Sequence, residues 1–314
     1  MQEVLLIGTG KMGRAYAATL AALGTQVTAI GRSKMGAQKF TEETGIPATP
    51  GGIAVWKKSA NSAPSHAIIA VGVEGLVTVA TEVIEAGCKE ILLEKPGALT
   101  RAELVALQTK AAAAGARIYV AYNRRFCTSA RAAQKYIVED GGVVSYSFAF
   151  NERLTQRQTL KELGISEKVQ QAWFIANSTH VVDLAFYLGG MPKEIRSFTA
   201  AGSLWAPHPT LFTGAGITEH NVPFSYYANW ELPGPWSVIV GTKKRNIILQ
   251  PLESLAVEEN AVAVTVDLGD ELDKKYKPGL YLQTKAFLEG GRKLLTLDKQ
   301  IAQFEWFEKI LSGN

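Results

Sequence analysis

The motif Gly8-Thr9-Gly10-Lys11-Met12-Gly13 constrains the fold of this chain more than any other feature. It follows a short apolar run at residues 4–7, typical of a buried strand, and precedes an Ala- and Leu-rich run at residues 15–23, typical of a helix. A second apolar run at residues 26–30 completes a strand–helix–strand unit of about thirty residues, as a dinucleotide-binding βαβ unit requires. We therefore predict that the chain begins with a Rossmann-type fold.

Each glycine of the motif has its own predicted role. Gly8 allows the tight turn after the strand, Gly10 lets the backbone approach a pyrophosphate, and Gly13 lets the helix pack closely against the strand. The helix N-terminus, at Lys11 and Met12, would offer backbone N–H groups and the positive end of its dipole to the phosphates. A glycine-rich turn in another kind of α/β domain is the alternative, which the context of the motif disfavours.

The segment after the second predicted strand favours NADP(H) over NAD(H). A carboxylate usually binds the adenosine ribose there, but the sequence reads Gly31-Arg32-Ser33-Lys34, and the next acidic residue is Glu42. Arg32 can form charge-assisted hydrogen bonds to a 2′-phosphate, Ser33 can add a donor, and Lys34 adds positive charge. The alternative is that Arg32 stacks on adenine or faces solvent, which keeps NAD(H) open.

Alternating strands and helices continue to residue 122. Apolar runs predict strands at 67–71, 91–93 and 118–122, and helices at 74–86 and 100–114, the latter with a capping box. The alternation indicates a mostly parallel sheet covered on both faces. Polar residues follow the strand ends, where ligands bind in such sheets, and we expect them to line one crevice: Glu94, Lys95, Tyr122, Asn123, Arg124 and Arg125.

The second half of the chain has a different pattern. Short runs separated by turn residues predict an antiparallel sheet with one covered face, from strands at 143–150, 195–201, 224–232, 236–241, 246–250 and 262–268. Helices are predicted at 281–288 and 301–311. Residues 204–221, rich in Pro, Gly and aromatic side chains, are predicted to form a long loop that serves as a lid or an oligomer contact. The predicted domains are residues 1–122 and 123–314.

Composition and charge exclude several classes of protein. Of the 314 residues, 47% are apolar and 20% charged, which excludes disordered and collagen-like chains. A net charge of +4 argues against a nucleic-acid partner. Two cysteines and four histidines without zinc-type spacing predict no metal site and a reducing compartment. Because no apolar run reaches about 18 residues and no signal peptide is evident, we expect a cytoplasmic protein that does not enter a membrane.

Three further motifs occur in the order that a known family has them. Glu94-Lys95-Pro96 follows a mid-sheet strand, Asn123-Arg124-Arg125-Phe126 follows a later one, and His180-Val181-Val182-Asp183 lies on a predicted apolar helix. With the glycine motif, they make the chain resemble the glucose–fructose oxidoreductase, inositol dehydrogenase and MocA (Gfo/Idh/MocA) family along essentially its full length.

The resemblance implies a fold and an activity. The fold class is α/β, with an N-terminal Rossmann domain on a doubly wound parallel sheet and a C-terminal α/β domain with a large open, mainly antiparallel sheet. The activity is NAD(P)-dependent hydride transfer at a hydroxyl or keto carbon of a sugar, sugar nucleotide or cyclitol. A second subunit commonly covers the open sheet in this family, so a homodimer or homotetramer is expected.

The family's catalytic residues correspond to Lys95 and His180 of this chain. Histidine titrates near neutrality, so His180 is expected to act as acid or base, with Lys95 binding the hydroxyl or taking part in the proton relay. A lysine can exchange that proton if its pKa is lowered, or it can stay charged and polarise the oxygen. The alternatives are a hydrogen-bonded core histidine and a solvated loop lysine.

One position departs from the family. The family often has an aspartate four residues before the histidine, where this chain has Ala176. The proton chemistry is therefore expected to rest on Lys95 and His180, with Asn177 as a polar binder. The residues before the histidine, and the segment 277–283 (KPGLYLQ), resemble the branch that acts on sugar nucleotides or other surface-polysaccharide precursors.

Several candidate roles stay open at this point. The candidate substrate-binding residues are Tyr122, Asn123, Arg124, Asn177 and Asp183. Arg124 and Arg125 either bind an anionic substrate or form salt bridges, and Asp183 either serves the site or caps a buried network. Two alternative functions are a reductase of another carbonyl or imine group and a catalytically silent NAD(P)-binding sensor. Ala176 favours the sensor, whereas retention of Lys95 and His180 disfavours it.

Overall fold

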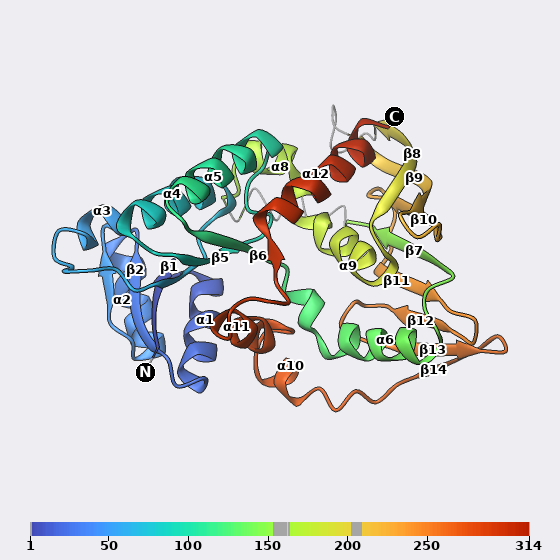
Figure 1. Ribbon diagram of the computed structural model, residues 1–314, viewed down its shortest axis with the longest axis horizontal. Helices are drawn as coiled ribbons and strands as arrows, with labels where there is room; N and C mark the ends of the chain where they lie inside the picture. The colour runs from blue at the N-terminus through green and yellow to red at the C-terminus, as the bar shows by residue number, and fades with distance from the viewer. Residues whose placement is uncertain (1, 153–161, 163, 202–208, 314) are drawn as a thin grey trace. The chain divides into compact units, whose positions relative to one another are not determined.

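The computed structural model describes residues 2–152, 162, 164–201 and 209–313, and Figure 1 shows their course. The chain divides into two compact units, residues 1–123 with 272–301 and residues 124–271 with 302–314. The division drawn from the sequence treats each domain as one continuous segment, and it differs from these units at Asn123 and in residues 272–301.

The first unit contains a seven-stranded sheet in the order β15-β6-β5-β4-β1-β2-β3. Strands β1 to β6 are parallel, and β15 pairs antiparallel with β6. This is the strand order of a dinucleotide-binding doubly wound sheet, and it brings the carboxyl ends of β1, β2 and β4 to one edge. The strands are β1 (Glu3–Ile7), β2 (Gln26–Gly31), β3 (Ala48–Pro50), β4 (His66–Ile69), β5 (Glu90–Glu94), β6 (Arg117–Ala121) and β15 (Leu295–Thr296).

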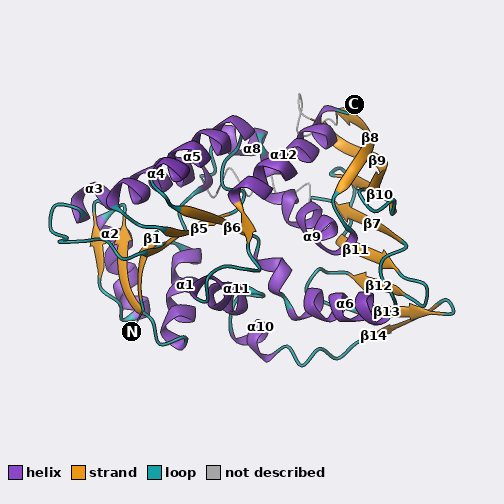
Figure 2. Cartoon of the chain, in the orientation of Figure 1, coloured by secondary structure: helices purple, strands orange, loops and turns teal. Residues whose placement is uncertain are grey.

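Helices cover both faces of this sheet (Figure 2), so the central strands β1, β4, β5 and β6 are mostly apolar and buried, whereas the edge strand β3 is not. One face carries α1 (Lys11–Ala22), α2 (Lys34–Thr44) and α11 (Leu280–Leu288), and the other carries α3 (Gly52–Trp56), α4 (Leu76–Ala86) and α5 (Arg101–Ala113). The predicted capping box starts α5: the Thr100 hydroxyl accepts from the Glu103 N–H at 3.3 Å, and the Glu103 carboxylate accepts from the Thr100 N–H at 3.1 Å. The short helix α10 (Glu271–Lys275) precedes α11.

The second unit contains an eight-stranded sheet in the order β14-β13-β12-β11-β7-β10-β9-β8. The β7–β10 pair is parallel and the other described pairs are antiparallel, so the predicted fold class is confirmed. The strands are β7 (Ser145–Phe150), β8 (Pro192–Ala201), β9 (Pro209–Thr218), β10 (Pro223–Asn229), β11 (Trp236–Gly241), β12 (Asn246–Leu249), β13 (Ala256–Glu259) and β14 (Val262–Thr265).

Helices α6 (Thr128–Glu139) and α9 (Thr179–Gly189) pack on one face of this second sheet. Aromatic rings alternate toward that face along β7, where Phe148 contacts Phe186 of α9 at a ring-centroid distance of 6.0 Å. The other described helices are α8 (Glu167–Gln171), the short 3-10 helices η1 (Val73–Gly75) and η2 (Asn123–Phe126), the π-helical turn η3 (Phe174–Ser178) and α12 (Leu297–Ser312). Helix α12 contributes residues to both units.

The predicted long loop at residues 204–221 is wrong for most of its length. Residues 204–208 lie outside the described residues, but Pro209–Thr218 form β9, which pairs with both β8 and β10. The glycines of β9 make room for aromatic rings of β10: an added Cβ at Gly214 would lie 2.5 Å from the Tyr226 ring, and one at Gly216 would lie 2.6 Å from the Phe224 ring. Glycine here marks close packing inside a sheet rather than a loop.

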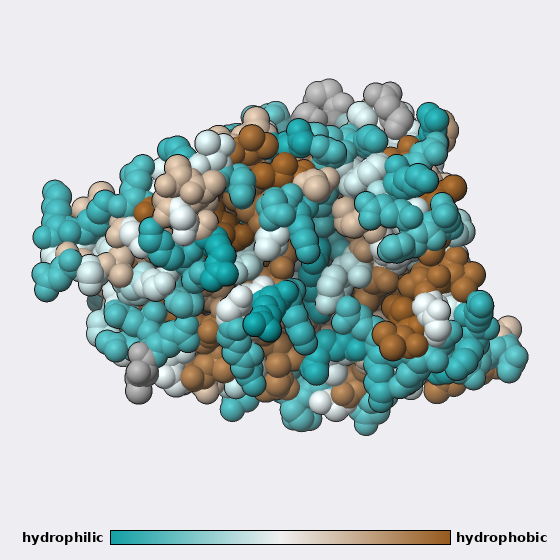
Figure 3. Space-filling model, in the orientation of Figure 1, coloured by the Kyte–Doolittle hydropathy of each residue, from teal (hydrophilic) through white to brown (hydrophobic). Residues whose placement is uncertain are grey.

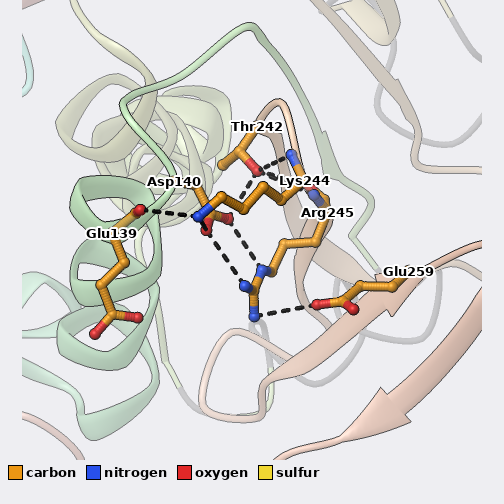
Figure 4. A network of polar contacts seen from close by, with 6 residues as sticks. All are labelled: Glu139, Asp140, Thr242, Lys244, Arg245 and Glu259. Carbon is orange, nitrogen blue, oxygen red and sulfur yellow. Dashed lines mark hydrogen bonds and ion pairs between the residues drawn. The ribbon is translucent and has the colours of Figure 1, made fainter.

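A buried carboxylate joins α6 to the β11–β12 hairpin (Figure 4). Asp140, at the end of α6, accepts a hydrogen bond from the Thr242 hydroxyl at 2.9 Å and forms ion pairs with Arg245 at 3.0 Å and Lys244 at 3.6 Å. Arg245 also pairs with Glu259 of β13 at 3.2 Å. Because burial of a charge is costly without such partners, this network locates α6 on the sheet.

We expect the substitution Asp140→Asn to lower the free energy of unfolding by about 3 kcal/mol, since it leaves the partly buried Arg245 without its main counter-charge. Urea denaturation followed by circular dichroism measures the change. The matched control is Glu139→Gln, an exposed neighbour, which should change stability by less than about 0.5 kcal/mol. Equal stability of Asp140→Asn and the wild type would show that the network contributes nothing.

Candidate functional site

A groove of about 560 Å³ lies in the first unit at the carboxyl ends of β1, β2 and β4. Its walls are residues 7–10 around the glycine motif, 30–33 at the end of β2, 51–54 at the start of α3 and 70–72 after β4. Ligands of open parallel sheets bind at this edge.

The three glycines of the motif meet different surroundings. Gly8 has φ +114, and a Cβ there would collide with the carbonyl oxygen of Ala70. A Cβ at Gly13 would collide with the carbonyl oxygen of Gly8, so α1 packs against the loop as the spacing predicts. A Cβ at Gly10 would meet nothing within 4 Å. The open side of Gly10 is the space that a pyrophosphate would need, so this loop fits a dinucleotide.

The residues after β2 lie at the groove, with one exception. Arg32 and Ser33 line it, and Ser33 also caps α2 by accepting a hydrogen bond from the Gly36 N–H at 3.1 Å. Lys34 begins α2 and is exposed, but it is not part of the groove wall. Two carboxylates that the sequence did not suggest, Glu74 and Glu82, line the groove from the side of α4.

Lys95 follows a buried carboxylate at the end of β5. Glu94 accepts a hydrogen bond from the Tyr16 hydroxyl of α1 at 2.8 Å. Burial raises the pKa of Glu94 above its ordinary value, although the hydrogen bond from Tyr16 and the positive charges of Lys95 and Lys277 act to lower it. Lys95 is half-buried, and the Lys95–Pro96 peptide bond is cis.

The segment 277–283 is part of this first unit. With its amide oxygen assigned to the side of the β6 end, the buried side chain of Gln283 accepts hydrogen bonds from the backbone N–H groups of Tyr122 at 3.2 Å and Asn123 at 3.0 Å. Asn123 donates from Nδ2 to the carbonyl oxygen of Pro278 at 2.7 Å. These contacts place Lys277 beside the glycine motif, with its Nζ 3.0 Å from the Met12 sulfur. Sequence reasoning had not connected this segment with the motif.

Two predicted substrate-binding residues of this unit are engaged in packing. Tyr122 is 1% exposed, and its hydroxyl accepts a hydrogen bond from Gln300 Nε2 at 3.3 Å. Asn123 is 5% exposed, and its side-chain amide donates a hydrogen bond to the carbonyl oxygen of Pro278. These contacts favour a positioning role for both side chains.

In the second unit, Arg125 and Asp183 form a nearly buried bidentate ion pair. Arg125 donates to Asp183 at 2.6 and 2.8 Å, and Gln303 donates to the same carboxylate at 2.9 Å. Arg124 pairs with Glu253 at 3.1 Å and lies over the Trp236 ring at 5.2 Å. Both arginines therefore form salt bridges, which is one of the two roles that the sequence left open for them. Asp183 belongs to a buried network, which is likewise one of its two roles left open.

His180 is the second residue of α9 and is 6% exposed. Its ring centroid lies 6.2 Å from that of Trp236 on β11. The π-helical turn η3 precedes it, and turns of this kind are frequent at functional sites.

A carboxylate that sequence reasoning missed contacts this turn. Asn177 Nδ2 donates to both carboxylate oxygens of Glu152, at 3.1 and 3.0 Å, and the Ser178 hydroxyl donates to one of them at 2.7 Å. Glu152 follows β7 without a recognisable motif. The one sequence feature that could have indicated Glu152 was its charge, two residues after a strand in which apolar and other residues alternate.

Lys95 belongs to the first unit and His180 to the second, so the two predicted catalytic residues lie in different units. Among the described residues no helix is long and apolar enough to span a membrane. The described part of the chain also has no group of three His, Cys, Asp or Glu residues able to hold a metal ion.

The molecule is thus a two-unit protein in which a dinucleotide-type Rossmann unit is combined with a large, mainly antiparallel sheet. Residues 2–122 match the family described as "Oxidoreductase family, NAD-binding Rossmann fold" (GFO_IDH_MocA). The resemblance to the Gfo/Idh/MocA family is confirmed, and this segment belongs to the family as its NAD-binding domain. Comparison with curated protein sequences gives no match.

Solved structures of the same fold cover nearly the whole chain. UDP-N-acetylglucosamine 3-dehydrogenase GnnA from Acidithiobacillus ferrooxidans is 16% identical to this chain, with a TM-score of 0.76. The match covers 99% of this chain and 97% of the GnnA chain. The WlbA dehydrogenase from Chromobacterium violaceum, in complex with NADH and UDP-GlcNAcA, is 13% identical with a TM-score of 0.76, covering 99% and 93%. Biliverdin reductase from Synechocystis sp. PCC 6803, in complex with biliverdin and NADP+, is 16% identical with a TM-score of 0.72, covering 99% and 98%. At these identities the likeness establishes the fold.

Proposed function

We propose that the chain is an oxidoreductase that prefers NADP(H) to NAD(H) and acts on a hydroxyl or keto carbon of a sugar, sugar nucleotide or cyclitol. The observation that carries the proposal is the groove of the first unit, which combines the open side of Gly10 with Arg32 and Ser33 at the end of β2. The family match of residues 2–122 supports NAD(P) as the cofactor.

The cofactor would be held by three groups of residues. The motif residues Gly8, Gly10, Lys11, Met12 and Gly13 would bind the pyrophosphate, and Arg32 and Ser33, with Lys34 nearby, would bind the 2′-phosphate. Glu94 and Lys95 would lie toward the reacting end. When bound, the cofactor supplies the hydride acceptor or donor.

The protein's own residues would handle the proton and the orientation of the substrate. His180 takes the proton of the substrate hydroxyl in oxidation and returns it in reduction, and Lys95 binds and polarises a substrate hydroxyl. Asn177 is the remaining candidate for substrate contact, since Arg124 forms a salt bridge and Tyr122, Asn123 and Asp183 are engaged in buried networks. Sugar nucleotides are the first substrates to test, because GnnA and the WlbA dehydrogenase share the fold.

The test is a screen that follows the nicotinamide absorbance with UDP-, GDP- and dTDP-sugars, free sugars and cyclitols. Turnover of one of these classes supports the proposal. Biliverdin and simple ketones and imines form a second panel, because a biliverdin reductase has the same fold. If only compounds of the second panel are turned over, the proposed sugar substrate is wrong, and the substrate class is that of the compound turned over. Cofactor binding without turnover in either panel would point to a sensor.

We further propose that the open face of the second sheet forms a homodimer or homotetramer contact. Phe198, Thr213 and Tyr227 lie in register across β8, β9 and β10 on the face opposite to α6 and α9. Phe198 is 67% exposed and Tyr227 is 49% exposed. Figure 3 shows apolar surface gathered at the right of the view, where Figure 1 draws the strands of this sheet. Exposed apolar patches of this kind mark interaction surfaces.

The substitution Phe198→Glu should weaken self-association by about thirtyfold or more, since burying a charge at the centre of an interface is unfavourable. Light scattering over a dilution series measures the change. Val138→Glu is the control, because Val138 is 79% exposed but lies on α6, away from this face. A monomeric wild type would contradict the proposed contact.

A further inference from the structure

Glu152 is a buried carboxylate in a position that the proposed chemistry does not yet use. It is 2% exposed and lies two residues beyond the end of β7. The three hydrogen bonds from Asn177 and Ser178 come from the last two residues of η3. His180 follows two residues later, in the first turn of α9.

The backbone that carries Glu152 is held firmly on the sheet. The neighbouring Asn151 accepts a hydrogen bond from the Asn229 N–H at 2.6 Å, which ties the end of β7 to the end of β10. Phe150 packs against Phe174, the first residue of η3, at a ring-centroid distance of 5.3 Å. The carboxylate therefore contacts η3 from a position close to the end of a sheet strand that itself packs against η3.

The carboxylate also determines which way the Asn177 amide faces. An ionised carboxylate only accepts hydrogen bonds, so Nδ2 of Asn177 must face Glu152 and Oδ1 must face away. Asn177 lies in η3 and His180 follows three residues later at the start of α9, so η3 leads directly into the turn that carries His180. Glu152 thus orients the Asn177 amide in the turn that precedes the proposed acid/base residue.

We propose that Glu152 is a positioning residue that acts through Asn177 and Ser178 to fix the orientation of His180 and to present Asn177 Oδ1 as an acceptor for a substrate hydroxyl. The inference rests on the proposed function, in which His180 exchanges the substrate proton.

The kinetic test compares Glu152→Gln with Asp140→Asn, the matched control at another buried carboxylate of the same unit that accepts from a hydroxyl. The glutamine can donate as well as accept, so the Asn177 amide is no longer oriented. We expect Glu152→Gln to lower kcat by about ten- to hundredfold, while cofactor Kd stays within about twofold. Glu152→Asp, which keeps the charge, should recover part of the loss. Asp140→Asn should lower stability and keep kcat within about twofold.

The second arm needs no substrate. The chain has four histidines, so the ring ¹⁵N resonances of His180 can be assigned by their loss in His180→Ala. We expect them to shift in Glu152→Gln and to stay in place in Asp140→Asn. If Glu152→Gln does not fold, Ser178→Ala removes a single hydrogen bond of the same carboxylate and serves in both arms.

The outcomes separate the two proposals. Unshifted His180 resonances in Glu152→Gln overturn the positioning role, and so does a kcat loss no larger than that of Asp140→Asn. If the wild type turns over no substrate, the proposed function fails, while the ¹⁵N spectra still show whether Glu152 orients His180.

Discussion

Replacing His180 by alanine should lower kcat by about a hundredfold to ten-thousandfold, the contribution typical of a positioned acid or base. His180 is not among the residues that line the cofactor groove, so cofactor Kd should change by less than about twofold. Steady-state kinetics on the substrate found in the screen give kcat, and a fluorescence titration gives Kd.

The matched control is His220→Ala, because His220 is exposed at the turn between β9 and β10. His180→Gln serves as a second variant of similar size, since alanine leaves a cavity at this buried position. Turnover near the wild-type value in both variants would remove His180 from the mechanism. Lys95→Ala should reduce kcat strongly as well while the cofactor still binds, and wild-type turnover there would remove Lys95.

Replacing Arg32 by alanine should weaken NADP(H) binding by about ten- to hundredfold and change NAD(H) binding by less than about twofold. The difference arises because only NADP(H) carries the 2′-phosphate, to which a guanidinium makes charge-assisted hydrogen bonds. Titration of the wild type and the variant with both cofactors measures the four Kd values, and no substrate is required.

Lys39→Ala is the control for this experiment, since Lys39 is an exposed cation of α2 that does not line the groove. An NAD(H) preference of the wild type would contradict the predicted cofactor. An equal loss of both cofactors in Arg32→Ala would show that Arg32 serves the adenine or the fold instead of the 2′-phosphate.

Local pattern was sufficient to predict the βαβ unit with which the first unit begins. The periodicity of residues 4–30 and the spacing of the glycines reflect short-range requirements, and Gly13 is indeed packed against Gly8. The same reasoning failed for β9, where Gly214 and Gly216 serve close packing in a sheet. It also did not associate residues 272–301 with the first unit, because that association depends on contacts such as those of Gln283 with the backbone after β6.

For the candidate site, too, some features followed from the sequence and others only from the structure. Sequence identified the residue types and their order, including the glycine motif, Arg32, Lys95 and His180, and left the roles of Arg125 and Asp183 open. The structure assigned Arg125 and Asp183 to one ion pair and revealed Glu152 beside Asn177.

Local sequence pattern was enough to predict a Rossmann domain of an NAD(P)-binding family and the side chains available for chemistry there, because turns and strand–helix alternation are encoded within a few neighbouring residues. Which polar groups are already engaged depends on how distant segments of the chain pack together. The partners of Asp183 are 58 and 120 residues away in the sequence, and the Asn177 partner of Glu152 is 25 residues away. No local pattern records such pairings, since a buried charge finds its hydrogen bonds only when the elements that carry them are packed together.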